Sequence, residues 1–153
     1  MKKFLSILVL IALVLSLSAC GGKKEAAPSA DLAAVLAEFK LGDEMMALDL
    51  DDLVNLYFFD AADIKQSAAA IHTSGINADE IIMIEAVDAD AAARVKNILD
   101  ARYEAKLNEM RDYIAEEYAI IEKCSVTANG NFVAMIVAPN APELVEIYNK
   151  SIK

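Results

Sequence analysis

The sequence predicts an α+β domain in which a long central helix packs against an antiparallel sheet made of two hairpins. The stretch Asp88–Glu117 repeats its apolar residues at helical spacing and contains neither glycine nor proline. Short apolar runs that are typical of strands lie before and after it. We therefore expect one sheet of three to four strands across the long helix, with further helices at the N- and C-terminal ends of the domain.

Two helices are expected before the first hairpin. The segment Asp31–Lys40 places apolar side chains on one face, and Gly42 ends it. That face consists of Leu32, Val35, Leu36 and Phe39. A second helix begins at Asp49 or Asp51, so that Asp51 and Asp52 lie in its first turn, where negative charge suits the helix dipole.

The first hairpin contains an ambiguous segment, Ala61–Ser74. Its alanines favour a helix, whereas Ile71-His72-Thr73 favours a strand. The isoleucine-rich run Glu80–Val87 indicates a buried strand. We pair the two segments as a hairpin with an open loop at Ser74–Asp79; a helical Ala61–Ser74 would leave a three-stranded sheet.

The long helix has the clearest periodicity in the chain, and Asp88 or Asp90 can cap it. Its apolar stripe consists of Val95, Leu99, Tyr103, Leu107, Met110 and Ile114. We expect this stripe to pack on the sheet.

The last elements are a second hairpin and a closing helix. Strands are expected at Ser125–Ala128 and Phe132–Ala138, joined by Asn129-Gly130, the preferred dipeptide of a type I′ turn. Asn140–Ile152 is expected to be helical, with Pro142 in its first turn.

The first twenty residues have the pattern of an export signal. Lys2 and Lys3 precede an apolar run, Phe4–Leu17, that is shorter than the roughly twenty residues needed to span a bilayer. Leu17-Ser18-Ala19-Cys20 resembles the lipobox of bacterial lipoproteins. The resemblance implies a signal peptide over residues 1–19 and a lipid, with fatty acids such as palmitate, on Cys20. The mature protein would then be anchored in the cell membrane on its extracytoplasmic face.

Composition divides the mature chain into a lipidated flexible tether, residues 20–29, and a single acidic α+β domain, residues 30–153. Without Lys2 and Lys3 the chain has 12 basic and 24 acidic residues, a formal charge of −12. Such a surface repels nucleic acid and anionic lipid headgroups. We therefore expect no nucleic acid as a partner. The expected partners are the membrane, through the lipid on Cys20, and a protein of the cell envelope.

Few residues offer the chemistry of an enzyme. His72 is the only histidine, and Cys124 has no disulfide partner once Cys20 carries lipid. Histidine-based triads and zinc sites are hard to build from one histidine, and the chain has no glycine-rich phosphate loop. Carboxylates are abundant, but most are explained as helix caps or turn residues. The sequence therefore assigns no catalytic, cofactor-binding or metal-binding residue.

Several features together resemble the domain of unknown function 4358 family, which is found in bacterial lipoproteins. They are the lipobox, the segment Ser74–Ile81, the long helix with Arg102 and Tyr118, and Gly130-Asn131-Phe132-Val133. The similarity extends over about Leu50–Ala138. The family has no established activity, so the resemblance implies the cellular address and the α+β order of elements, and it implies no catalytic residue.

The leading hypothesis is a non-catalytic interaction or ligand-binding domain held at the membrane. One alternative is an envelope hydrolase that uses carboxylates such as Glu80 and Asp88, and another is a low-affinity cation-binding lipoprotein. A converging acidic pair would favour the enzyme, and a carboxylate cluster would favour the cation. An exposed apolar patch bounded by polar residues would favour a protein partner.

Replacing Cys20 by serine tests the predicted anchor. Cys20→Ser should abolish labelling of the protein with a radioactive fatty acid, because the thioether needs sulfur. Cys124→Ser, which keeps Cys20, is the matched control and should be labelled normally. Undiminished labelling of Cys20→Ser would contradict the prediction.

Overall fold

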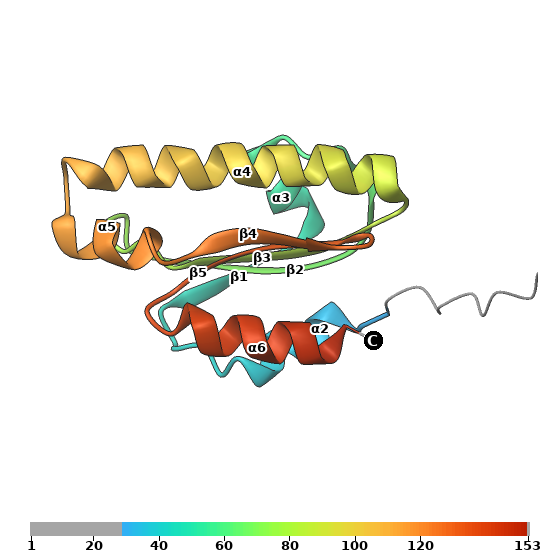
Figure 1. The fold of residues 1–153 in the computed structure, drawn as a ribbon, viewed down its shortest axis with the longest axis horizontal. Helices are drawn as coiled ribbons and strands as arrows, with labels where there is room; N and C mark the ends of the chain where they lie inside the picture. The colour runs from blue at the N-terminus through green and yellow to red at the C-terminus, as the bar shows by residue number, and fades with distance from the viewer. Residues whose placement is uncertain (1–28, 153) are drawn as a thin grey trace, which may run out of the picture.

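The protein has three layers in the computed structural model, which describes residues 29–152 (Figure 1). A five-stranded antiparallel sheet with the order β1-β2-β3-β5-β4 forms the middle layer. The helices α3 and α4 lie on one face of it, and α2 and α6 cover the other (Figure 1). The α+β class, the antiparallel sheet and the long helix are confirmed, but the sheet has five strands rather than three or four.

The elements have the following bounds. The strands are β1 (Met45–Leu48), β2 (Ile64–His72), β3 (Glu80–Ala86), β4 (Ser125–Asn129) and β5 (Phe132–Val137). The helices are α2 (Leu32–Glu38), α3 (Leu50–Tyr57), α4 (Ala89–Arg111), α5 (Ala115–Ile121) and α6 (Ala141–Ser151), with one 3₁₀ turn at Ala61–Asp63. The predicted signal peptide and most of the predicted tether, which ends at residue 29, lie outside the described residues.

The additional strand, β1, is an edge strand that pairs only with β2. It has four residues and no apolar–polar alternation, so its sequence carries little strand signal. The ambiguous segment 61–74 is mostly strand, because β2 extends from Ile64 to His72. Hydrogen-bonded neighbours on both sides override the helical preference of Ala68–Ala70.

The predicted helix Asp88–Glu117 is two helices rather than one. The helix α4 ends at Arg111, and α5 begins at Ala115 after a short turn. The Met110 carbonyl accepts hydrogen bonds from the N–H groups of Tyr113 and Ile114, which closes the last turn of α4. The chain has no glycine or proline there, so the break has no local sequence signal.

The stripe of α4 faces inward mainly as predicted. Val95, Leu99 and Met110 are buried, and Tyr103 and Leu107 are partly buried and pack against the core, while Lys106 is buried as well. Ile114, the last predicted member of the stripe, is the N-cap residue of α5.

The turn of the second hairpin is shifted by one residue from the predicted position. Asn129 pairs with Phe132 as the last residue of β4, so the two loop residues are Gly130 and Asn131. A type I′ turn needs positive φ at both loop residues, and here only Gly130 has it, at 57°. Glycine at the first position with a positive φ is typical of a type II′ turn instead.

The predicted aspartate caps are confirmed at two helices. Asp49 begins α3 and forms a capping box with Asp52. The Asp88 carboxylate accepts a hydrogen bond of 2.8 Å from the Ala91 N–H at the start of α4. Both carboxylates therefore satisfy backbone groups at helix N-termini.

The strand register determines which side chains face α4. Every residue of β3 and β5 is buried, because both strands lie between the two helical layers. Glu85, paired with Gln66, belongs to the face of α2, since Gln66 accepts a hydrogen bond from the Leu32 N–H of that helix. Side chains alternate along a strand, so Glu80 at the start of β3 belongs to the opposite face and points toward α4.

Truncating Leu99 tests the packing of α4 on the sheet. Leu99 is fully buried, so Leu99→Ala should lower the free energy of unfolding by about 2–5 kcal/mol. The loss is measured by denaturant titration. Leu56→Ala is a suitable control because Leu56 is largely exposed. A loss below about 0.5 kcal/mol for Leu99→Ala would show that the stripe faces solvent.

Candidate functional site

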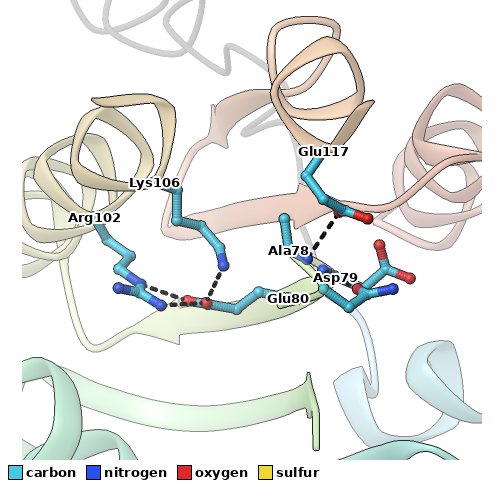
Figure 2. A network of polar contacts seen from close by, with 7 residues as sticks. Ala78, Asp79, Glu80, Arg102, Lys106 and Glu117 are labelled. Carbon is cyan, nitrogen blue, oxygen red and sulfur yellow. Dashed lines mark hydrogen bonds and ion pairs between the residues drawn. The ribbon is translucent and has the colours of Figure 1, made fainter. Parts of the chain in front are cut away.

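A cluster of buried and half-buried charges joins β3 to α4 (Figure 2). Glu80 is fully buried. Arg102 donates hydrogen bonds to it from Nε to Oε1 at 2.9 Å and from Nη2 to Oε2 at 2.7 Å. The Lys106 Nζ lies 2.9 Å from Oε2 of the same carboxylate. One buried carboxylate therefore binds two cations that are one helical turn apart on α4.

The cations keep Glu80 ionised. Burial by itself raises the pKa of Glu80, but the hydrogen bonds from Arg102 and the charge of Lys106 outweigh burial and hold the pKa below its usual value. The hydrogen bonds to Glu80 raise the pKa of Arg102. The cluster therefore pairs an ionised Glu80 with the guanidinium of Arg102.

Tyr57 connects the same cluster to α3. The guanidinium carbon of Arg102 lies 5.7 Å from the centre of the Tyr57 ring, which is a cation–π contact. Burial, followed by the nearby charge of Glu80, raises the pKa of Tyr57 above its usual value. The residue Arg102 thus holds α3, α4 and β3 together.

The loop between β2 and β3 is tied to α5. The Ala78 N–H donates a hydrogen bond of 2.9 Å to Oε2 of Glu117 (Figure 2). Next to it, the Asp79 N–H donates to Oδ1 of Asn77 at 2.7 Å. The Oδ1 atom of Asp79 is buried and has no hydrogen-bond partner among the described residues. Burial and then the charge of Glu117 raise the pKa of Asp79.

His72 and Cys124 have separate surroundings. The Nδ1 atom of His72 accepts a hydrogen bond from the Ser74 N–H, and its Nε2 lies 3.0 Å from a Glu44 carboxylate oxygen. Cys124 lies directly before β4, where its Sγ donates to the Ile120 carbonyl at 3.3 Å and burial raises its pKa. A thiol in this environment stays protonated, as expected of a structural cysteine.

Glu80 and Asp88, the carboxylates considered for a hydrolase, do not converge. Glu80 begins β3 and Asp88 follows its last residue by two positions, so the two residues lie roughly 25 Å apart along the strand direction. Such a distance is too large for paired acid–base catalysis. Across residues 29–152, no group of three or more His, Cys, Asp or Glu side chains is arranged to hold a metal ion.

Two hollows open beside the charged cluster. The first, with a volume of about 190 Å³, lies between α4 and the loop after β2, and we call it the polar pocket. The second, with a volume of about 420 Å³, lies between α3 and α4, and we call it the apolar groove. Its lining consists of Leu56, Tyr57, Phe58, Ile98, Ala101, Arg102 and Ala105. Arg102 lines both hollows.

Phe58 forms one wall of the apolar groove in an unusual conformation. It is the C-cap of α3 with φ 61° and ψ 31°, the left-handed region that favours glycine. Its side chain is 84% exposed. A bulky aromatic residue in this region is a conformational outlier and costs roughly 1–2 kcal/mol. Phe58 therefore combines a strained backbone with an aromatic side chain that is exposed to solvent.

Sequence reasoning missed two of these residues. Lys106 was given no role from the sequence, although its position four residues after Arg102 indicates that the two share a side of α4. Phe58 lies in Tyr57-Phe58-Phe59, which has no feature that distinguishes the exposed member. Tyr57 and Phe59 are buried, so only the backbone conformation at the helix end separates Phe58 from them.

Comparison with known families matches residues 37–138 to the domain of unknown function (DUF4358). The chain belongs to this family. The DUF4358 match begins before β1 and ends after β5, so it includes the whole sheet and the charged cluster. No curated protein and no solved structure matches the chain. Within residues 29–152, none of the helices is long and apolar enough to cross a membrane.

Removing the Glu80 carboxylate tests the charged cluster. Glu80→Gln leaves Arg102 and Lys106 without a counter-charge, so the free energy of unfolding should fall by about 3–5 kcal/mol at pH 7. Asp51→Asn, on the exposed side of α3, should cost less than about 0.5 kcal/mol. Equal stability of Glu80→Gln and the native protein in denaturant titration would contradict the role of the cluster.

The same variant should alter the dependence of stability on pH. A carboxylate whose folded pKa is lowered stabilises the fold above its unfolded pKa, near 4.5, and this contribution disappears as pH falls through the folded value. The stability difference between the native protein and Glu80→Gln should therefore shrink in this acidic range.

Proposed function

We propose that the protein is a membrane-tethered binding domain that contacts a protein of the cell envelope through the apolar groove. The export signal with Cys20 supports the tether. The observation that supports the binding function is made at Phe58. This residue lies at the edge of the groove and combines a strained backbone with an exposed aromatic side chain.

Phe58 and its neighbours have the properties of a contact surface. Leu56 is 58% exposed beside Phe58, whereas the opposite wall on α4 offers the small side chains of Ala101 and Ala105. Exposed aromatic residues beside small ones form the knobs and hollows into which partner side chains pack. A local cost in backbone strain is typical of residues that are retained for function rather than for stability.

The expected occupant is an apolar side chain on a basic protein surface. The walls of the groove are themselves exposed, so the groove cannot enclose a small molecule as a typical ligand pocket does. The mature chain has a charge of −12, which favours a partner of opposite sign and repels the anionic membrane surface. A tether also raises the effective concentration of the domain toward a membrane partner.

The arrangement of carboxylates supports binding over catalysis. Glu80 is neutralised by two cations, and Asp88 caps α4. Neither carboxylate has a partner at the distance that acid–base chemistry requires. The proposal therefore assigns the function to an exposed surface rather than to these side chains.

Replacing Phe58 by glycine separates stability from binding. Glycine adopts the left-handed conformation without strain, so Phe58→Gly should leave the free energy of unfolding unchanged or raise it by up to about 1 kcal/mol. The same change removes the apolar wall and should abolish binding to the partner. A marked loss of stability would instead show that Phe58 supports the fold.

Photo-crosslinking in the native membrane measures the binding. A photoreactive phenylalanine analogue at position 58 should form an adduct with one protein, and the adduct should disappear when Ala105→Trp fills the groove. Tyr113, an exposed aromatic residue that does not line the groove, is the matched control position. Equal adducts from positions 58 and 113, or adducts that persist with Ala105→Trp, would contradict the proposal.

A further inference from the structure

A second surface, the polar pocket, has a chemistry different from that of the apolar groove. It lies between α4 and the loop that follows β2, and its volume is about 190 Å³. The helix contributes Arg102, Lys106 and Glu109, and the loop contributes polar residues around Gly75. A Cβ atom on Gly75 would have no other part of the protein within 4 Å apart from its chain neighbours. The loop side of the pocket is therefore open.

Arg102 and Lys106 carry more hydrogen-bond donors than Glu80 accepts. An arginine has five N–H donors and a lysine has three. Among the described residues, Glu80 binds two N–H donors of Arg102 and one donor of Lys106. Neither cation has a further hydrogen-bond acceptor in this part of the chain. A pocket lined by such side chains is complementary to a group that is rich in acceptor oxygens.

Burying the charged end of Lys106 costs free energy unless a group of opposite charge compensates it. Its side chain is only 6% exposed, and Glu80 is already paired by both oxygens with Arg102. Desolvating a second cation beside one carboxylate is costly, and Asp79, a half-buried carboxylate whose charge also acts on Lys106, forms no ion pair with it. Glu109 lines the same pocket and its charge acts on Arg102, but it is exposed and forms no hydrogen bond among the described residues, so water weakens this interaction without abolishing it.

We propose that the polar pocket binds an oxyanion, the carboxylate or phosphate group of a small ligand, between Lys106 and Arg102. The donors of Lys106 that Glu80 leaves free would bind the anion directly, and Arg102 would supply its remaining N–H groups at the boundary with the groove. The bound anion would add a negative charge beside the two cations and compensate part of the cost of burying Lys106. This site shares Arg102 with the apolar groove, but anion binding does not require the docking surface around Phe58.

Two probes, inorganic phosphate and acetate, test the site on the full chain in detergent. Each is titrated at pH 7 and constant ionic strength against chloride, with the amide resonance of Gly75 and calorimetry as readouts. A saturable change with phosphate alone identifies a phosphate site, one with acetate alone identifies a carboxylate site, and one with both identifies a general oxyanion site. No saturable change with either probe overturns the proposal.

Three variants locate the binding. Lys106→Met preserves the Glu80–Arg102 pair and the side-chain volume, so the protein should fold, and the Kd should rise about tenfold or more. Lys65→Met, which removes an exposed lysine paired with Glu85 on the other face of the sheet, should leave the Kd unchanged. Glu109→Gln removes a competing charge and should lower the Kd about two- to fivefold.

The outcomes are separable even if one variant fails to fold. Circular dichroism and denaturant titration establish whether Lys106→Met is native. If it is not native, Glu109→Gln decides, because tighter anion binding there supports the pocket. An unchanged or raised Kd in Glu109→Gln, or an unchanged Kd in a folded Lys106→Met, overturns the assignment.

Discussion

The carboxylate of Glu80 is the constraint on which the arrangement of this domain depends. Every residue of β3 is buried, so an ionised side chain at its start needs a counter-charge from the layer above. Arg102 meets this need with two parallel hydrogen bonds, which fix both the rotation and the axial position of α4 over β3. The ring of Tyr57 then packs against the same guanidinium, so α3 is positioned by the same pair.

The unequal cover of the sheet explains where the two hollows lie. The long helix α4 contacts β3, β4 and β5, whereas the other half of the sheet has the eight-residue α3 on that face. Two helices of such different length leave the flank of α4 open, and both hollows are lined by that flank. The opposite face is covered by α2 and α6, with Gln66 bonded to the start of α2. Both hollows therefore lie on the face of the sheet that α3 and α4 cover.

The features that sequence predicted are those that depend on neighbouring residues along the chain. The caps at Asp49 and Asp88 and the stripe through Val95 and Leu99 follow from local spacing, and the structure confirms them. The strand β1 exists because β2 offers it a partner, which no property of Met45–Leu48 reveals. The break before α5 depends in the same way on tertiary packing.

The candidate sites were harder to predict because each depends on distant contacts. The pairing of Glu80 with Arg102 joins residues 22 positions apart, so neither side chain signals the other in the sequence. Phe58 differs from the buried Phe59 only through a left-handed backbone at the end of α3. The exposure of a side chain and the balance of charges around it depend on how the sheet and the helices pack together.

The energetics of the cluster distinguish the roles of its two cations. A buried ion pair often contributes no more stability than apolar side chains of equal volume, so its presence is better explained by the geometry it specifies. Arg102 alone occupies both oxygens of Glu80 and is sufficient to set the position of α4. Lys106 adds a desolvated charge without adding a constraint of its own, because it shares an oxygen that Arg102 already binds. The position of α4 therefore accounts for the arginine, whereas the burial of the lysine agrees with the anion site that we propose in the polar pocket.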